Sequence, residues 1–200
     1  MMKLRLWKIA AVVTEWADSN IKSGPQGDRM LTKLTVAFLL LASVTYAQHP
    51  DDVFVGQPAP EIKKSDVWIN SSPLTMASLK GKVVVVDFWA FDCPYCAEAM
   101  PHVLDLYNKY AKDGLVIIGV HTPRIDYEKD VPKIREAVVK KGIKYPVVVD
   151  NQYDIWSDYL CNVWPSQFVI DRDGIIQFSH SGVGRYEDME KVVQKLISKK

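Results

Sequence analysis

Two cysteines three positions apart, Cys93 and Cys96, are the residues of this sequence best suited to do chemistry. A C-x-x-C pair can form a redox-active disulfide or supply half of a zinc site. Zinc would need two further ligands at a matching spacing, and the sequence has neither a second C-x-x-C nor an H-x-H pair. The spacing therefore favours a redox-active disulfide, and we expect no metal and no cofactor.

The cysteine pair lies where a predicted strand, residues 82–90, gives way to a predicted helix, residues 94–112. Pro94 suits the first turn of a helix, where its missing N–H is no loss. A helix N-terminus offers unpaired N–H groups and a positive dipole end, which would stabilise a thiolate at Cys93. We expect Cys93, the more exposed of the two sulfurs, to attack a substrate and Cys96 to resolve the product.

Strand-like and helix-like patterns alternate along the chain, which is typical of an α/β fold. Two β-branched runs, residues 83–86 and 115–120, are apolar on both faces, as in central strands covered by helices. The turn Asp171–Gly174 predicts an antiparallel hairpin at one side of the sheet. The predicted strands span residues 67–70, 82–90, 115–121, 146–150, 166–171 and 175–181, and the predicted helices span residues 94–112, 131–141, 153–159 and 187–199.

The sequence resembles the thioredoxin superfamily, and within it the extracytoplasmic thiol-disulfide oxidoreductases of the TlpA/ResA kind. The resemblance covers residues 53–198 and is closest to the DipZ-like group, whose thioredoxin-like domain occurs alone or attached to membrane electron carriers. It implies a thioredoxin-like fold, with a central mixed β-sheet flanked by helices, and protein thiols or disulfides as substrates. The stretches that carry it are WINSSPLTMASLKGKVVVVDFWAFDCPYC, LVIIGVHTP, YPVVVDN and VWPSQFVIDRDG.

Three further site residues follow from this resemblance, Pro165, Trp164 and Asp87, and a fourth, Tyr95, follows from its position beside the thiol. Pro165 falls where the family has a cis-proline, and the preceding Trp164 would contact an extended substrate. Tyr95, between the cysteines, is expected to be exposed and to touch substrate. Asp87 matches the family's buried acid and would accept the proton of Cys96 during resolution. The alternative for Asp87 is a carboxylate that faces water at the end of its strand.

Other residues near the pair have simpler expected roles. Trp89 is expected to be a packing residue, although the matching Trp in the family shields the sulfurs. His121 is expected to be a structural histidine, and Cys161 a buried inert thiol rather than a third redox partner. Asp92 departs from the family, and its negative charge would oppose a thiolate at Cys93.

The N-terminal segment reads as a targeting sequence. The apolar run 34–44 follows basic residues and is shorter than the roughly 18 to 20 residues that span a bilayer, so we expect a signal peptide cleaved after Ala47. An uncleaved membrane anchor and a buried core helix are the alternatives. The expected organisation is a non-structural extension at 1–29, with translation starting at Met30, a signal peptide or anchor at 30–47, and a thioredoxin-like domain at 48–200.

The charge balance of the sequence argues against nucleic-acid binding. The 200 residues carry a net charge of +1, which gives no basic field of the kind that nucleic-acid binding requires. We therefore expect a secreted, periplasmic or membrane-anchored thiol-disulfide oxidoreductase that meets proteins, with a membrane electron donor as a further expected partner. Two alternatives share the fold: a peroxidase of the peroxiredoxin type, whose P-x-x-x-T-x-x-C signature is absent, and a copper chaperone, which would want a C-x-x-x-C and a distal histidine.

Overall fold

The computed structural model describes residues 54–62 and 65–199 of the chain, and these belong to one compact unit, residues 49–200. The extension expected at 1–29 and the signal peptide or anchor expected at 30–47 lie outside the described residues. In the part of the chain that is described, no helix is both long and apolar enough to cross a membrane.

A mixed sheet of six strands organises the domain, in the order β1-β4-β3-β2-β5-β6. The central strand β2 pairs in parallel with β3 on one side and antiparallel with β5 on the other. The predicted hairpin is confirmed, because β5 and β6 pair antiparallel at the end of the sheet. The strands are β1 (Trp68–Ile69), β2 (Val83–Trp89), β3 (Leu115–His121), β4 (Val147–Val149), β5 (Ser166–Ile170) and β6 (Ile176–Ser181).

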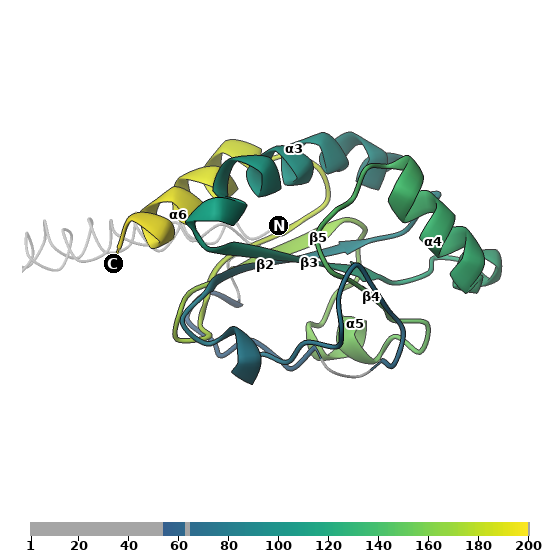
Figure 1. The fold of residues 1–200 in the computed structure, drawn as a ribbon, viewed down its shortest axis with the longest axis horizontal. Coiled ribbons are helices and arrows are strands. Elements are labelled where there is room, and N and C mark those ends of the chain that lie inside the picture. The colour runs from purple at the N-terminus through teal and green to yellow at the C-terminus, as the bar shows by residue number, and fades with distance from the viewer. Residues whose placement is uncertain (1–53, 63–64, 200) are drawn as a thin grey trace, which may run out of the picture. The chain divides into compact units, whose positions relative to one another are not determined.

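Helices cover both faces of this sheet, as Figure 1 shows, with α3, α4 and α6 on one face and α5 on the other. Alternate residues of β2 therefore enter two different cores: Val85 and Trp89 pack with the cysteine pair, whereas Val86 and Phe88 pack towards α5. All seven residues of β2 are buried, as the apolar run predicts. The helices are α3 (Pro94–Tyr110), α4 (Val131–Lys140), α5 (Asp154–Asp158) and α6 (Tyr186–Ser198).

Every predicted strand and helix is present, with its ends within two residues of the predicted ones. The difference lies in three short 3₁₀ helices that the patterns did not predict: η2 (Ala77–Leu79), η3 (Ala111–Asp113) and η4 (Asp126–Lys129). The second of these is the end of the predicted helix 94–112, whose last turn tightens before Gly114 adopts φ +99°.

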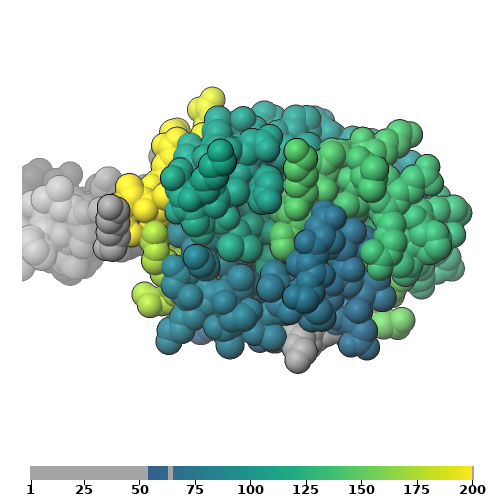
Figure 2. Space-filling view, in the orientation of Figure 1, coloured from purple at the N-terminus to yellow at the C-terminus, as the bar shows by residue number. Residues whose placement is uncertain are grey.

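The C-terminal ends of β2 and β3 position the residues of the candidate site. Strand β2 leads directly into the loop that precedes α3. Because β3 is parallel to β2, the C-terminal end of β3 lies at the same edge of the sheet. Side chains of α3, of α4 and of residues 54–62 and 65–79 fill the space that the ribbons leave open (Figure 2). The candidate site therefore lies at one edge of a packed sheet, where two neighbouring strands end.

Candidate active site

A disulfide between Cys93 and Cys96 lies at the start of α3, with their Cα atoms 5.2 Å apart. Cys93 is the N-cap residue, and its Sγ accepts a hydrogen bond of 3.1 Å from the backbone N–H of Cys96. Pro94 occupies the first turn, as its ring geometry favours. An anionic Cys93 sulfur would be stabilised at this position, because it faces an N–H group at the positive end of the helix.

Exposure does not distinguish the two sulfurs. Cys93 and Cys96 are each 2% exposed, so the expectation that Cys93 is the more exposed one is wrong. Both belong to the buried cluster between α3 and the sheet, and the partly buried rings of Phe91 and Trp164 pack against that cluster. The N-cap position, rather than accessibility, is what makes Cys93 different from its partner.

Tyr95 lies between the cysteines and is 62% exposed, as expected. A large aromatic side chain in this position presents apolar surface to solvent beside the disulfide. It is therefore available for contact with another molecule.

Asp87 is a buried carboxyl group on the same face of β2 as Val85 and Trp89, the face that packs against the cysteine pair. It is 2% exposed, and its Oδ1 accepts a hydrogen bond of 3.1 Å from the side chain of Gln167, its register partner on β5. Burial raises the pKa of Asp87 to about 6, while the Gln167 hydrogen bond lowers it in part. The alternative of an Asp87 that faces water is wrong, because every residue of β2 is covered on both faces.

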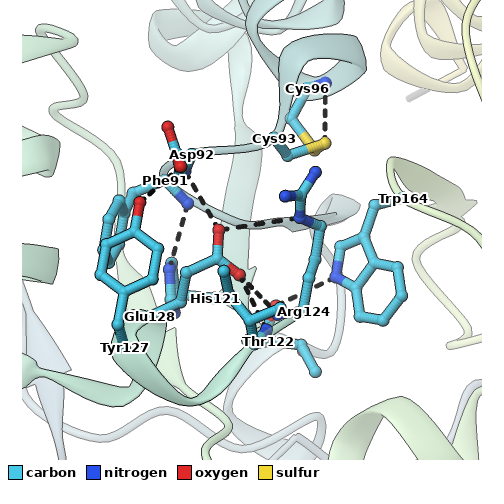
Figure 3. Close-up of polar contacts among 11 residues, drawn as sticks. Phe91, Asp92, Cys93, Cys96, His121, Thr122, Arg124, Tyr127, Glu128 and Trp164 are labelled. Carbon is cyan, nitrogen blue, oxygen red and sulfur yellow. Dashed lines mark hydrogen bonds and ion pairs between the residues drawn. A yellow bond between two sulfur atoms is a disulfide. The ribbon is translucent and has the colours of Figure 1, made fainter.

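The loop before β5 contains a cis peptide bond between Trp164 and Pro165. The indole Nε1 of Trp164 donates a hydrogen bond of 3.0 Å to the carbonyl oxygen of Thr122, and its ring stacks on Trp156 with 4.0 Å between centroids. Trp164 also packs against the cluster that holds the disulfide. The side chain thus joins the loop before β5 to the loop after β3, close to the cysteine pair (Figure 3).

His121, the last residue of β3, is fully buried next to the loop that precedes Cys93. Its Nε2 accepts a hydrogen bond of 3.2 Å from the backbone N–H of Phe91, and its ring stacks on Phe91 and meets Trp89 edge-on. Burial lowers the pKa of His121 to about 3, so the ring is neutral at physiological pH. These contacts fit the expected structural role.

Glu128 is a site residue that the sequence patterns missed. Its carboxylate is fully buried at η4, where Oε1 accepts the backbone N–H of Asp92 at 3.2 Å. Its Oε2 accepts the backbone N–H groups of Arg124, at 2.5 Å, and of Ile125, at 3.3 Å. Glu128 thereby ties the loop after β3 to the residue that precedes Cys93. Its place three residues after Ile125, at the start of a helical turn, is the signal that could have indicated such a role.

Asp92 is exposed, and its carboxylate accepts a hydrogen bond from the hydroxyl group of Tyr127. This hydrogen bond is the main cause that raises the pKa of Tyr127 to about 12. The negative charge that was expected to oppose a Cys93 thiolate is therefore shared with a phenol and with solvent.

Cys161 is the free cysteine of the described chain. It is partly buried against the cluster on the α5 side of the sheet, and burial raises the pKa of its thiol above the usual range. The Cys93–Cys96 disulfide belongs to the cluster on the other side. Over residues 54–62 and 65–199, no three His, Cys, Asp or Glu side chains form a group that could hold a metal ion.

Comparison with known proteins identifies the family to which the chain belongs. A model described as the AhpC/TSA family matches residues 55–179. Protein DipZ of Mycobacterium tuberculosis is 38% identical over 143 residues, which make up 70% of this chain and 21% of DipZ. The thiol-disulfide oxidoreductase YkuV of Bacillus subtilis is 28% identical over 142 residues, or 71% of this chain and 95% of YkuV. The chain thus spans about a fifth of DipZ but nearly all of YkuV.

Solved structures confirm the thioredoxin-like fold that the resemblance implied. The solution structure of a thioredoxin-like protein in the oxidized form is 30% identical, with a TM-score of 0.64 over 71% of this chain and 95% of the other. The crystal structure of a thioredoxin-like superfamily protein is 25% identical, with a TM-score of 0.66 over 72% of this chain and 97% of the other. Relatives and structural neighbours include proteins named as thiol-disulfide oxidoreductases.

Proposed function

The chain belongs to the AhpC/TSA family, and we propose that it is a thiol-disulfide oxidoreductase that exchanges disulfides with protein substrates through Cys93 and Cys96. The observation that carries the proposal is the disulfide between these residues at the N-terminus of α3, with the Cys93 sulfur facing a helix N–H group. A sulfur in this position is a good nucleophile when reduced and a good leaving group when bonded to another sulfur.

In the first step the Cys93 thiolate attacks one sulfur of a disulfide in the partner protein. A bond forms between Cys93 and that sulfur, and the second partner sulfur leaves as a thiolate with the bonding electron pair. The product is a mixed disulfide between the two proteins. The N–H group of Cys96 stabilises the attacking anion because it already points at the Cys93 sulfur.

In the second step Cys96 loses its proton and attacks the Cys93 sulfur. The Cys93–Cys96 bond forms, and the partner sulfur leaves as a second thiolate, so that the partner is reduced and the pair is oxidised. We assign the proton to Asp87, whose pKa of about 6 lets the carboxylate accept it near neutral pH. The same two steps in reverse transfer the disulfide to a partner dithiol.

Two features support contact with an extended protein segment. Tyr95 offers exposed aromatic surface beside the disulfide, and the loop at Trp164–Pro165 packs against the same cluster. We propose that a substrate segment lies across this loop and that Tyr95 and Trp164 contact it. The two residues are far apart in the sequence, so one segment would touch α3 and the loop before β5 together.

We further propose that the chain works outside the cytoplasm and receives electrons from a membrane carrier, since the apolar run 34–44 is typical of an export signal. Mass spectrometry of the exported or membrane fraction tests this, and the expected mature chain starts near Gln48. A cytosolic protein that retains Met1 would contradict the proposal.

Trapping of mixed disulfides in cells tests the enzymatic proposal. We expect full-length Cys96→Ser to accumulate covalent complexes with other proteins, because its first step is intact and its second step is blocked. Cys93→Ser should trap none. Both variants are made with Cys161→Ser, so that the remaining free cysteine contributes no complexes of its own.

Equal trapping by the two variants would contradict the assignment of Cys93 as the attacking residue. Complexes that Cys93→Ser forms only when Cys161 is retained would instead make that thiol the reactive one. Peroxide turnover and copper titration of the purified protein test the two alternatives that share the fold.

A further inference from the structure

Arg124 lies in the loop after β3 and is drawn with the cysteine pair in Figure 3, where its guanidinium group points towards the disulfide. We propose that Arg124 stabilises the thiolate of Cys93 in the reduced protein and thereby sets how fast Cys93 attacks a partner disulfide. The inference deepens the proposed thiol-disulfide exchange and rests on it.

The loop that carries Arg124 is held from several sides. The backbone N–H of Thr122 donates to the carbonyl oxygen of Trp89, and the carbonyl oxygen of Thr122 accepts the indole N–H of Trp164, each at 3.0 Å. The backbone N–H of Arg124 itself donates to the buried carboxylate of Glu128 at 2.5 Å. The backbone from which the Arg124 side chain starts is therefore held in place relative to β2 and the loop before β5.

The positive charge of Arg124 is only loosely paired. Its Nε lies 3.7 Å from Oε1 of Glu128, which is too long for a hydrogen bond. The Glu128 oxygens already accept three backbone N–H groups, from Asp92, Arg124 and Ile125. Across the described residues, the terminal nitrogens of Arg124 make no hydrogen bond. The guanidinium group therefore retains charge and donors that a nearby thiolate can use.

Arg124 is also shielded enough for its charge to matter, since its side chain is 29% exposed. Three carboxyl groups belong to this region, Asp87 on β2, Asp92 before Cys93 and Glu128 at η4, while His121 is uncharged because of its burial. The basic Lys133 lines a cavity with Phe91 and Asp92 and lies 5.4 Å from the Tyr127 ring, on the side of Asp92. These carboxylates disfavour a second negative charge at Cys93. Arg124, whose guanidinium group points towards the disulfide, is the cation that we propose offsets them at Cys93.

The test measures the pKa of the Cys93 thiol from the pH dependence of its alkylation by iodoacetamide. All proteins carry Cys96→Ser and Cys161→Ser, so that Cys93 is the one thiol that reacts. We expect Arg124→Gln to raise this pKa by about one unit and to slow alkylation near pH 6 roughly three- to tenfold. Arg124→Lys should restore at least half of the shift, because it restores the charge.

Arg135→Gln is the matched control. It removes the same charge with the same substitution from an exposed position on α4, and it should leave the pKa of Cys93 within about 0.2 unit. The difference in pKa between Arg124→Gln and the protein that keeps Arg124 should shrink in 1 M salt, as an electrostatic effect does and a structural one does not.

An unchanged pKa in Arg124→Gln would overturn the proposal, as would an equal rise in Arg135→Gln, a failure of Lys to restore the pKa, or a difference that salt leaves intact. The measurement needs no partner protein. Its failure would leave disulfide trapping by Cys96→Ser untouched, and a failure of trapping would leave the thiol pKa values as they are.

Discussion

At the scale of single residues, the proposed resolution step depends on a carboxyl group that the fold buries at some cost. Asp87 has one side-chain hydrogen bond, from Gln167, and no ion pair is seen for it among the described residues. A carboxylate in such a place is destabilised by the loss of water, which is why its pKa rises. Its location on the cysteine face of β2 gives this cost a function, because a base with a pKa of about 6 can take up a thiol proton.

The first prediction concerns the resolution step. With Asp87→Asn, release of the second thiol from a mixed disulfide with glutathione should slow at least about tenfold at pH 7, because no base accepts the Cys96 proton. The wild-type rate should rise as the pH passes through about 6, and the variant should lack this rise. Stopped-flow measurement from pH 5 to 8 checks both.

The attack of Cys93 should change less than about twofold, since it depends on the helix N-terminus. Identical resolution rates in the two proteins would remove Asp87 from the mechanism.

The second prediction concerns stability. The folded pKa of Asp87, about 6, lies above its ordinary value of 3.8. Between these pH values the unfolded state has lost a proton that the folded state still holds, so the free energy of unfolding falls as the pH rises through this window. Asp87→Asn should therefore raise the free energy of unfolding at pH 7 by as much as about 3 kcal/mol and give no gain below pH 4. Urea unfolding at both pH values measures this. A variant that is less stable than wild type at pH 7 would contradict this prediction. It would show that the folded protein stabilises the charged Asp87 carboxylate more than its contacts indicate.

At the scale of elements, the strands and helices were predictable and their junctions were not. Runs such as residues 83–86 and 115–120 define buried parallel strands, because few other structures bury both faces of an apolar segment. The C-x-x-C with Pro94 located the start of α3 correctly. Glu128, in contrast, stands between Tyr127 and Lys129 in a polar stretch, where sequence alone indicates a solvated side chain. Its burial also depends on the backbone N–H of Asp92, 36 residues away in the sequence, which no local pattern contains.

Glu128 provides the third prediction. Glu128→Gln replaces one acceptor oxygen by an N–H₂ group that faces backbone donors, so at least one buried N–H loses its partner. We expect a loss of about 1–3 kcal/mol of unfolding free energy, measured by urea unfolding of the oxidised protein. The matched control, Glu136→Gln on the exposed side of α4, should change it by less than about 0.5 kcal/mol. Equal effects of the two substitutions would mean that Glu128 does not hold the loop before Cys93.

At the scale of the whole molecule, the sheet separates the Cys93–Cys96 disulfide from the free thiol of Cys161. The face under α3 holds the disulfide and Asp87, whereas the α5 face holds Cys161 in a setting that suppresses ionisation. The resemblance anticipated the fold, the cysteine pair and the cis-proline. It did not anticipate the equal burial of the two sulfurs, because that depends on the packing of several segments into one cluster with the cysteine pair.

The redox potential follows from how well the reduced form is stabilised. The Pro-Tyr dipeptide between the cysteines resembles that of glutaredoxins, and the N–H of Cys96 already faces Cys93. Asp92 opposes a thiolate, but its carboxylate is exposed and accepts a hydrogen bond from Tyr127. A stabilised thiolate lowers the free energy of the reduced form and makes the disulfide more oxidising. We therefore expect a potential above the roughly −270 mV of thioredoxin, near −200 to −230 mV.

Equilibration of the full chain with glutathione buffers, followed by alkylation and mass spectrometry, measures whether Cys93 and Cys96 form and break their disulfide reversibly. With Cys161→Ser, the protein should change from no alkyl groups to two in a single reversible two-electron transition with a midpoint near −200 to −230 mV. Cys93→Ser in the same background should show no such transition. A Cys93–Cys96 pair that stays in one form across the whole series of buffers would contradict the account, because such a pair could not exchange disulfides with proteins.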